Sequence, residues 1–111
     1  MVYYEITNGD KIMTTQTVAE GDAIRLVVEG SVNSQTAETF EKALLPLVKE
    51  GKKVVVDFAG VDHLSSAGLR VLLEASNTVA KPEDLKLIHV SKDVKDVFDM
   101  TGFSDLLNIE D

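Results

Sequence analysis

One short run in the middle of the chain limits the folds that this sequence can adopt. Residues 52–59 contain Val54, Val55, Val56 and Phe58, so a strand formed here is apolar on both of its faces. Such strands lie in the centre of an α/β sheet, covered on both sides. Helical patterns precede and follow the run, which predicts a crossover unit with parallel strands. The sequence therefore predicts an α/β fold.

The first helical pattern covers residues 34–50. Its apolar stripe has spacings of three and four and consists of Ala37, Phe40, Ala43, Leu44, Leu47 and Val48. Asn33 or Ser34 would cap its start, and Gly51 would end it. Pro46 lies inside the pattern, where a proline removes a backbone hydrogen bond at a cost of about 3 kcal/mol. We therefore expect a kink there, or two short helices.

The second helical pattern begins at Ser65 or Ser66 and ends at Val79. One stripe holds Gly68, Leu72, Ala75 and Val79, and it is widened by Leu69 and Leu73. A turn over residues 81–84 and a strand over residues 85–90 follow. A last helix is predicted between Ser91, as its cap, and Gly102, as its stop. Residues 103–109 would form a short edge strand or an extended tail.

A hairpin is predicted before the first helix. Its strands are residues 10–18 and 23–29, joined by a turn at Glu20-Gly21-Asp22. In its second strand Ile24, Leu26 and Val28 alternate with Arg25 and Glu29, so one face should be buried and the other wetter. The whole chain, residues 1–111, is then one domain with a mixed sheet of four or five strands and three or four helices.

The composition restricts the class of partner. Eleven basic against nineteen acidic side chains give a formal net charge of −8, which argues against nucleic acid or an anionic membrane as partner. We expect protein partners. The absence of cysteine excludes disulfides, thiol nucleophiles and cysteine-ligated zinc, and it suits the cytosol. No targeting signal opens the sequence and no stretch reaches a membrane span, so we expect a cytoplasmic protein.

The sequence offers little catalytic machinery. His63 and His89 lack the spaced pairing that a helix offers a metal, so no metal site is predicted. Neither common phosphate-binding glycine loop is present, so no nucleotide cofactor is predicted. Asp93, Asp96 and Asp99 lie among lysines at helical spacing and form an ordinary solvated face.

The segment of residues 61–73 is the best candidate for a functional surface. It follows the buried strand and opens the second helix, and in open α/β sheets functional loops gather at the carboxyl ends of the strands. Ser65 and Ser66, followed by Ala67 and Gly68, leave a low surface on which a partner can dock. The structural alternative is that one serine caps the helix and that Gly68 permits close packing against a strand.

Two chemical roles can be compared for a serine at this place. A nucleophile would need a base, for which His63 is the only nearby candidate. The strained elbow of α/β-hydrolases also needs a glycine two residues before the serine, where Leu64 stands before Ser66. A serine that accepts a phosphoryl group needs only exposure, because the kinase supplies the base. The second role is therefore favoured.

Three segments together carry a family signature. The first segment runs from Val54-Val55-Val56-Asp57-Phe58 through Leu64-Ser65-Ser66-Ala67-Gly68-Leu69-Arg70-Val71-Leu72. The others are Gly30-Ser31-Val32-Asn33-Ser34-Gln35-Thr36-Ala37-Glu38 and Val97-Phe98-Asp99-Met100-Thr101-Gly102-Phe103. In these segments, in length and in element order, the chain resembles STAS domains, and bacterial anti-sigma factor antagonists in particular.

The resemblance implies a switch protein rather than an enzyme. Such proteins bind an anti-sigma factor that is also a serine kinase with the histidine-kinase-like ATPase fold, and so free the sigma factor. Phosphorylation of a serine at the start of the second helix ends this binding, and a metal-dependent serine phosphatase reverses it. Aligned on Gly68-Leu69, the acceptor is Ser66, with Ser65 as the less favoured choice. The implied partner-binding residues are Asn33, Ser34, Ser65, Ser66, Ala67, Gly68 and Arg70.

Two positions depart from the family pattern, and two other functions stay open. Ser65 and Asn33 stand where aspartates are usual, and we expect both near the acceptor serine. STAS domains also form parts of anion transporters, lipid-transport complexes and signalling scaffolds, so one alternative keeps the fold without a sigma factor. The remote alternative is a small serine hydrolase that uses Ser66 and His63.

Overall fold

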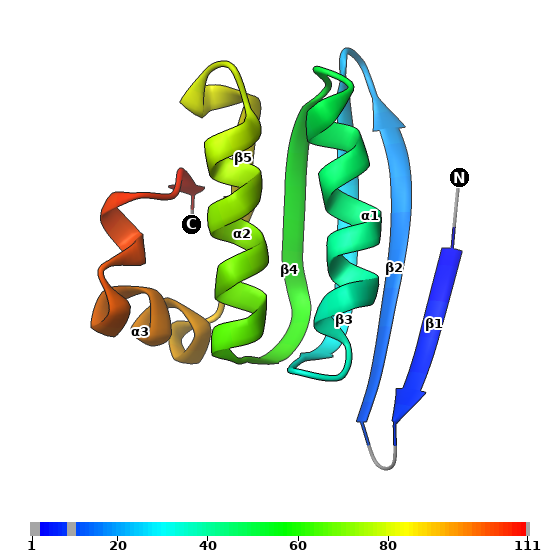
Figure 1. The fold of residues 1–111 in the computed structure, drawn as a ribbon, viewed down its shortest axis with the longest axis vertical. Coiled ribbons are helices and arrows are strands. Elements are labelled where there is room, and N and C mark those ends of the chain that lie inside the picture. The colour runs from blue at the N-terminus through cyan, green and yellow to red at the C-terminus, as the bar shows by residue number, and fades with distance from the viewer. Residues whose placement is uncertain (1–2, 9–10, 111) are drawn as a thin grey trace.

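The computed structural model describes residues 3–8 and 11–110. These residues form one mixed sheet of six strands in the order β1-β2-β3-β4-β5-β6, together with three α-helices (Figure 1). The strands are β1 Tyr3–Asn8, β2 Lys11–Glu20, β3 Ala23–Val32, β4 Lys53–Leu64, β5 Leu85–Ile88 and β6 Ile109–Glu110. The helices are α1 Ala37–Lys49, α2 Ser66–Thr78 and α3 Lys92–Thr101. The predicted α/β fold with a mixed sheet is confirmed.

The N-terminal strands pair antiparallel. β2 and β3 form the predicted hairpin, and Gly21 in their turn has a φ of +63°, which glycine adopts at little cost. β1 pairs with β2 at the outer edge, where the sequence pattern predicts no strand, and it makes the sheet larger than expected. Asp10, the predicted start of the first hairpin strand, lies outside the described residues.

The remaining strands build the parallel part of the sheet. β3, β4 and β5 are parallel neighbours, so the predicted crossovers through α1 and α2 are confirmed. Figure 1 shows α1 and α2 side by side on one face of the sheet. The loops that follow β3 and β4 lie at the same end of the sheet, the lower end in Figure 1. This end carries the candidate site.

Helix α1 differs from its prediction in two ways. It is one helix through Pro46 rather than two, because Pro46 lies on the exposed side, where water can reach the carbonyl that loses its donor. It starts at Ala37 instead of Ser34, because residues 33–36 form a separate turn. The predicted end is confirmed: Gly51 has a φ of +79°, and its amide donates to the Val48 carbonyl at 3.1 Å.

The C-terminal part contains the best-capped helix. In α3 the Ser91 hydroxyl accepts a hydrogen bond from the Val94 amide at 3.3 Å, and Gly102 ends the helix with a φ of +80°, both as predicted. The next residues, Phe103–Asp105, form a short 3-10 helix instead of the expected extended chain. Only Ile109–Glu110 adds a strand, parallel to β5 at the other edge.

The core lies between the sheet and the helices. Val54, Val56 and Phe58 of β4 are fully buried, and the Phe58 ring has the rings of Phe40 and Phe98 each at a centroid distance of 6.5 Å. The expectation that β4 is covered on both faces holds in part: on the face opposite the core residues Asp57 is buried, but Val55 is only half-buried. Its neighbours in the sheet register are Arg25 and Lys86, whose long stems can partly cover it in place of a helix.

Candidate functional site

The ends of β3 and β4 bring the predicted site residues together. The Ser65 amide donates to the Val32 carbonyl at 2.8 Å, and Val32 pairs with Leu64 in the parallel register. Asn33 and Ser34 therefore follow one strand directly beside the point where Ser65 and Ser66 follow the other. The structure thus supports the expectation that both family departures, Asn33 and Ser65, lie near the predicted acceptor serine.

The structural alternative, in which a serine hydroxyl caps α2, is wrong for Ser65. Ser65 occupies the N-cap position with extended backbone angles, but its hydroxyl makes no capping hydrogen bond. Its Oγ is buried and has no hydrogen-bond partner within the described part of the chain. The first helical hydrogen bond runs from the Leu69 amide to the Ser65 carbonyl. The amides that precede it in α2 therefore have no helical acceptor.

Ser66 is the accessible serine of the pair. It is the first residue of α2 and is exposed, whereas Ser65 and Ala67 are half-buried. Gly68 is buried: a Cβ atom placed on it would lie 2.5 Å from Leu64 Cδ1 and 2.8 Å from Val32 Cγ1. The prediction that this glycine allows close packing is confirmed. The accessible surface at the start of α2 is thus formed by Ser66, Ala67 and Arg70 rather than by Gly68.

Arg70 lies on the exposed side of α2, one turn after Ser66. Its guanidinium Nη1 is 4.0 Å from Glu41 Oε2 on α1, and 62% of its side chain is exposed. This distance is at the limit of an ion pair and beyond hydrogen-bonding range. Arg70 is therefore held only weakly.

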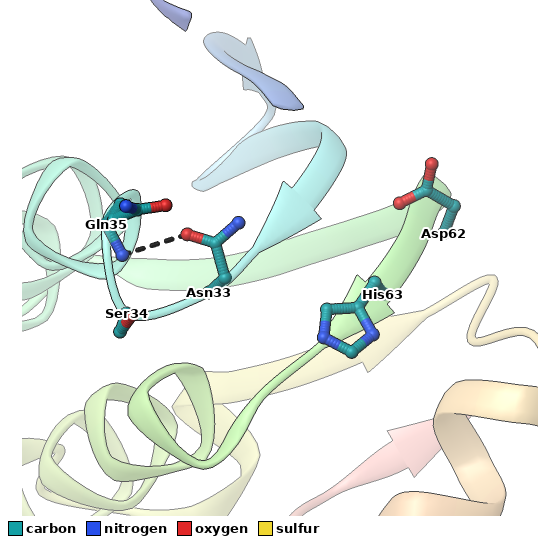
Figure 2. A pocket seen from close by; sticks show the side chains of 5 residues that line it. All are labelled: Asn33, Ser34, Gln35, Asp62 and His63. Carbon is teal, nitrogen blue, oxygen red and sulfur yellow. Dashed lines mark hydrogen bonds between the residues drawn. The ribbon is translucent and has the colours of Figure 1, made fainter. Parts of the chain in front are cut away.

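The loop after β3 is shaped by Asn33. Its Oδ1 accepts hydrogen bonds from the amides of Gln35 at 2.9 Å and Thr36 at 3.1 Å, the first of which is drawn in Figure 2. Thr36 is buried, and its hydroxyl donates to the Ser31 carbonyl at 2.8 Å. Asn33 thus caps the turn ahead of α1 rather than the helix itself. An aspartate could accept the same two hydrogen bonds.

An open depression of about 600 Å³ lies beside this loop. Its lining residues are Asn33, Ser34, Gln35, Asp62 and His63 (Figure 2). Ser31, buried next to it on β3, donates a hydrogen bond from its Oγ to Asp62 Oδ1 at 2.9 Å. All five lining residues have polar side chains, and Asn33 and His63 lie next to the ends of β3 and β4. Such a shape suits contact with a protein surface better than enclosure of a small molecule.

The arrangement gives no support to a hydrolase. No hydrogen bond joins Ser66 to His63 in the described structure, although a nucleophilic serine needs its base within reach. Over residues 3–8 and 11–110, no three His, Cys, Asp or Glu side chains gather in a way that could hold a metal ion.

Sequence reasoning missed a polar cluster on the face of the sheet opposite the core residues of β4. Asp57 is buried, and its Oδ1 binds His89 Nδ1 at 2.9 Å and the Ala59 amide at 2.9 Å. Its Oδ2 accepts a hydrogen bond from Arg25 Nη1 at 3.1 Å. Arg25 in turn forms an ion pair with Glu20. The cluster joins the strands β2, β3 and β4 to the residue after β5.

Asp57 is held in its charged form. Burial raises the pKa of its carboxyl group, but the Ala59 amide, His89 and Arg25 together lower this pKa below its ordinary value. His89 has a left-handed backbone with a φ of 57°, which is uncommon for a residue other than glycine. The only sequence signal for the cluster is a carboxylate inside an apolar strand, since a buried charge needs partners.

Comparison with known proteins decides the family. The sequence profile of the STAS domain matches residues 14–111. The chain belongs to the STAS domain family. It is 37% identical over 78 residues to BtrV of Bordetella bronchiseptica, a candidate anti-sigma factor antagonist, covering 68% of this chain and 67% of that protein. It is also 29% identical over 103 residues to the anti-sigma-B factor antagonist of Staphylococcus epidermidis, covering 89% of this chain and 94% of that protein.

Solved structures agree with this STAS fold. An anti-sigma factor antagonist from Mycobacterium paratuberculosis superposes with a TM-score of 0.80 at 20% identity, over 87% of this chain and 84% of that one. Unphosphorylated SpoIIAA superposes with a TM-score of 0.66 at 14% identity, over 87% of each chain. In residues 3–8 and 11–110, no helix has the length and apolar character needed to cross a membrane.

Proposed function

We propose that this STAS domain is an anti-sigma factor antagonist that acts in the cytoplasm and is switched by phosphorylation of Ser66. The curated relatives named anti-sigma factor antagonists support the role. The observation that carries the proposal is the position of Ser66: exposed, at the uncapped start of α2, and beside the loop after β3. Such a serine is open to a kinase and lies where a partner can dock. As a binding module, the domain needs no catalytic residue.

The proposed partner is an anti-sigma factor that is also a serine kinase with the histidine-kinase-like ATPase fold. It would contact the two adjoining loops and the first turn of α2, with Gly68 supporting this turn from below. The contact residues are Asn33, Ser34, Ser65, Ser66, Ala67 and Arg70. The kinase transfers the terminal phosphoryl group of ATP to Ser66 Oγ and accepts its proton. A metal-dependent serine phosphatase would hydrolyse the phosphate and restore the binding form.

A phosphate on Ser66 would act on the contact rather than on the fold. It adds about −1.5 to −2 charges at a helix N-terminus, where free amides and the helix dipole favour an anion. The domain therefore stays folded. A partner packed against Ser66 and Ala67 would instead have to cover a bulky, hydrated dianion, which ends the binding.

The two departures from the family pattern are compatible with this proposal. Asn33 stabilises the turn of its loop because its Oδ1 accepts two backbone hydrogen bonds, which an aspartate oxygen could also accept. Ser65 leaves the start of α2 without a carboxylate, so α2 has no acidic residue in its first turn. Neither change covers Ser66.

The proposal is tested by titrating the anti-sigma factor that serves this protein, monitored by calorimetry. Ser66→Ala should bind about as well as the parent. Ser66→Glu should bind about 30-fold more weakly or worse, because a charge is buried unpaired at the contact. Asn77→Glu adds the same charge on the exposed surface near the other end of α2 and should not weaken binding. Equal binding by Ser66→Glu and Asn77→Glu would contradict the proposed contact.

The acceptor is identified by mass spectrometry after incubation with that anti-sigma factor and ATP. Phosphate should appear on Ser66 in the parent and in Ser65→Ala, and it should disappear in Ser66→Ala. Phosphate that persists in Ser66→Ala and maps to Ser65 would reject the choice of acceptor.

A further inference from the structure

We propose that Arg70 is the internal counter-ion of phosphorylated Ser66. The inference rests on the proposed function, because it concerns the phosphate that this function places on Ser66. In the unmodified protein Arg70 is part of the surface offered to the partner. After phosphorylation it turns to the phosphate, so a single modification adds negative charge to the surface and withdraws a positive charge from it.

Helix geometry brings the two side chains together. Ser66 and Arg70 are four residues apart in α2, and residues at this spacing lie one above the other on the same face. Side chains in a helix lean toward its N-terminus, so the long Arg70 side chain can reach back toward Ser66. Both residues are exposed, and a guanidinium binds a phosphate through two parallel hydrogen bonds.

The present partner of Arg70 holds it loosely. Glu41 on α1 is 4.0 Å away, and the Arg70 side chain is 62% exposed. An exposed ion pair without a hydrogen bond contributes little. A dianion one helical turn away therefore competes well against this single carboxylate.

Within the described residues, α2 has no carboxylate on the N-terminal side of Arg70. The first turn of this helix contains no acidic residue, and Ser65 makes no side-chain cap. On α1, Glu38 is already paired with Lys42 at 2.8 Å. At the end of β4, Asp62 accepts a hydrogen bond from Ser31. Glu74, one turn further along α2, is exposed and carries a single charge, so a doubly charged phosphate on Ser66 would be the strongest anion within one helical turn of Arg70.

The test uses phosphoserine installed at position 66 during translation, so it needs no kinase. The second proton of the phosphate is followed by phosphorus NMR as the pH is varied, with a reference pKa of about 6. We expect the phosphate to bind this proton about twofold more weakly in the parent than in Arg70→Gln, as an ion pair at this helical spacing implies. Arg70→Lys should lie between the two. Glu41→Gln should keep the parent's behaviour or strengthen it.

A second readout follows Arg70 directly. The side-chain Nε–Hε signal of Arg70 should shift when Ser66 is phosphorylated, and it should do so in Glu41→Gln as well. Identical proton binding in the parent and Arg70→Gln, or an unmoved Arg70 signal, would overturn the inference and leave the proposed function intact. If neither the unphosphorylated protein nor the protein with phosphoserine at position 66 binds an anti-sigma factor, the proposed function is rejected, whatever the phosphorus titration shows.

Discussion

Gly68 has no room for a side chain. Its α-carbon faces Leu64 and Val32, whose atoms would lie 2.5 and 2.8 Å from an added Cβ. Alanine would gain about 1 kcal/mol in helix propensity, but overpacking a buried contact costs about 1 to 3 kcal/mol. We therefore expect Gly68→Ala to lower the free energy of unfolding by about 1 kcal/mol in urea denaturation.

The clash has a matched control. Leu64→Ala removes the nearer atom, so Gly68→Ala should cost less in that background than in the parent. A Gly68→Ala variant as stable as the parent would show that α2 can move away from the sheet without loss. The close approach of α2 would then not fix the position of Ser66.

The buried carboxylate of Asp57 shows which part of the polar cluster a single residue can predict and which part it cannot. An aspartate within an apolar strand predicts that a partner exists, because a buried charge is costly. Its partners Arg25 and His89 are each 32 residues away in the chain. They meet Asp57 only through the register of three strands, which the sequence pattern does not contain.

At the scale of elements, two serines in equivalent positions differ. Ser91 accepts a capping hydrogen bond from Val94, whereas Ser65 makes none. Ser91→Ala should therefore cost about 1 kcal/mol of unfolding free energy. Ser65→Ala should cost much less, since it removes a buried hydroxyl that has no partner. Denaturant titrations of both variants make the comparison, and equal losses would contradict the assigned caps.

The elements also show how far periodicity predicts this fold. From β2 onward, the order of strands and helices follows from apolar spacing, and the end of α1 at Gly51 follows from glycine. The start of α1 does not follow in this way. The side chains of Asn33 and Thr36 form hydrogen bonds within a turn, so the helix begins three residues later than predicted. Both serine and asparagine are common caps, and the sequence cannot show which amides their oxygens face.

At the scale of the whole molecule, the position of the candidate site is predictable because parallel strands end together. Once β3 and β4 are assigned as parallel neighbours, Asn33 and Ser66 must lie at the same end of the sheet. The weak ion pair between Arg70 and Glu41 is not predictable from the sequence, because it depends on how α1 and α2 pack against each other. Crossover topology thus predicts where the candidate site lies. The packing of α1 against α2 decides which charged side chains at this site form ion pairs.

The Asp57 cluster joins β2, β3 and β4 to the residue after β5, and it should make the stability of the whole domain depend on pH. Because the folded-state pKa of Asp57 lies below its unfolded value, its contribution is present above the ordinary aspartate range, about pH 4, and is lost as the pH falls through the folded pKa. Asp57→Asn should therefore cost about 2 kcal/mol near pH 7 and reduce the loss of stability in acid. Asp105→Asn, an exposed change of the same charge, should retain the parent's acid dependence. Urea titrations between pH 7 and pH 3 would contradict this role for Asp57 if both variants lost stability in parallel with the parent.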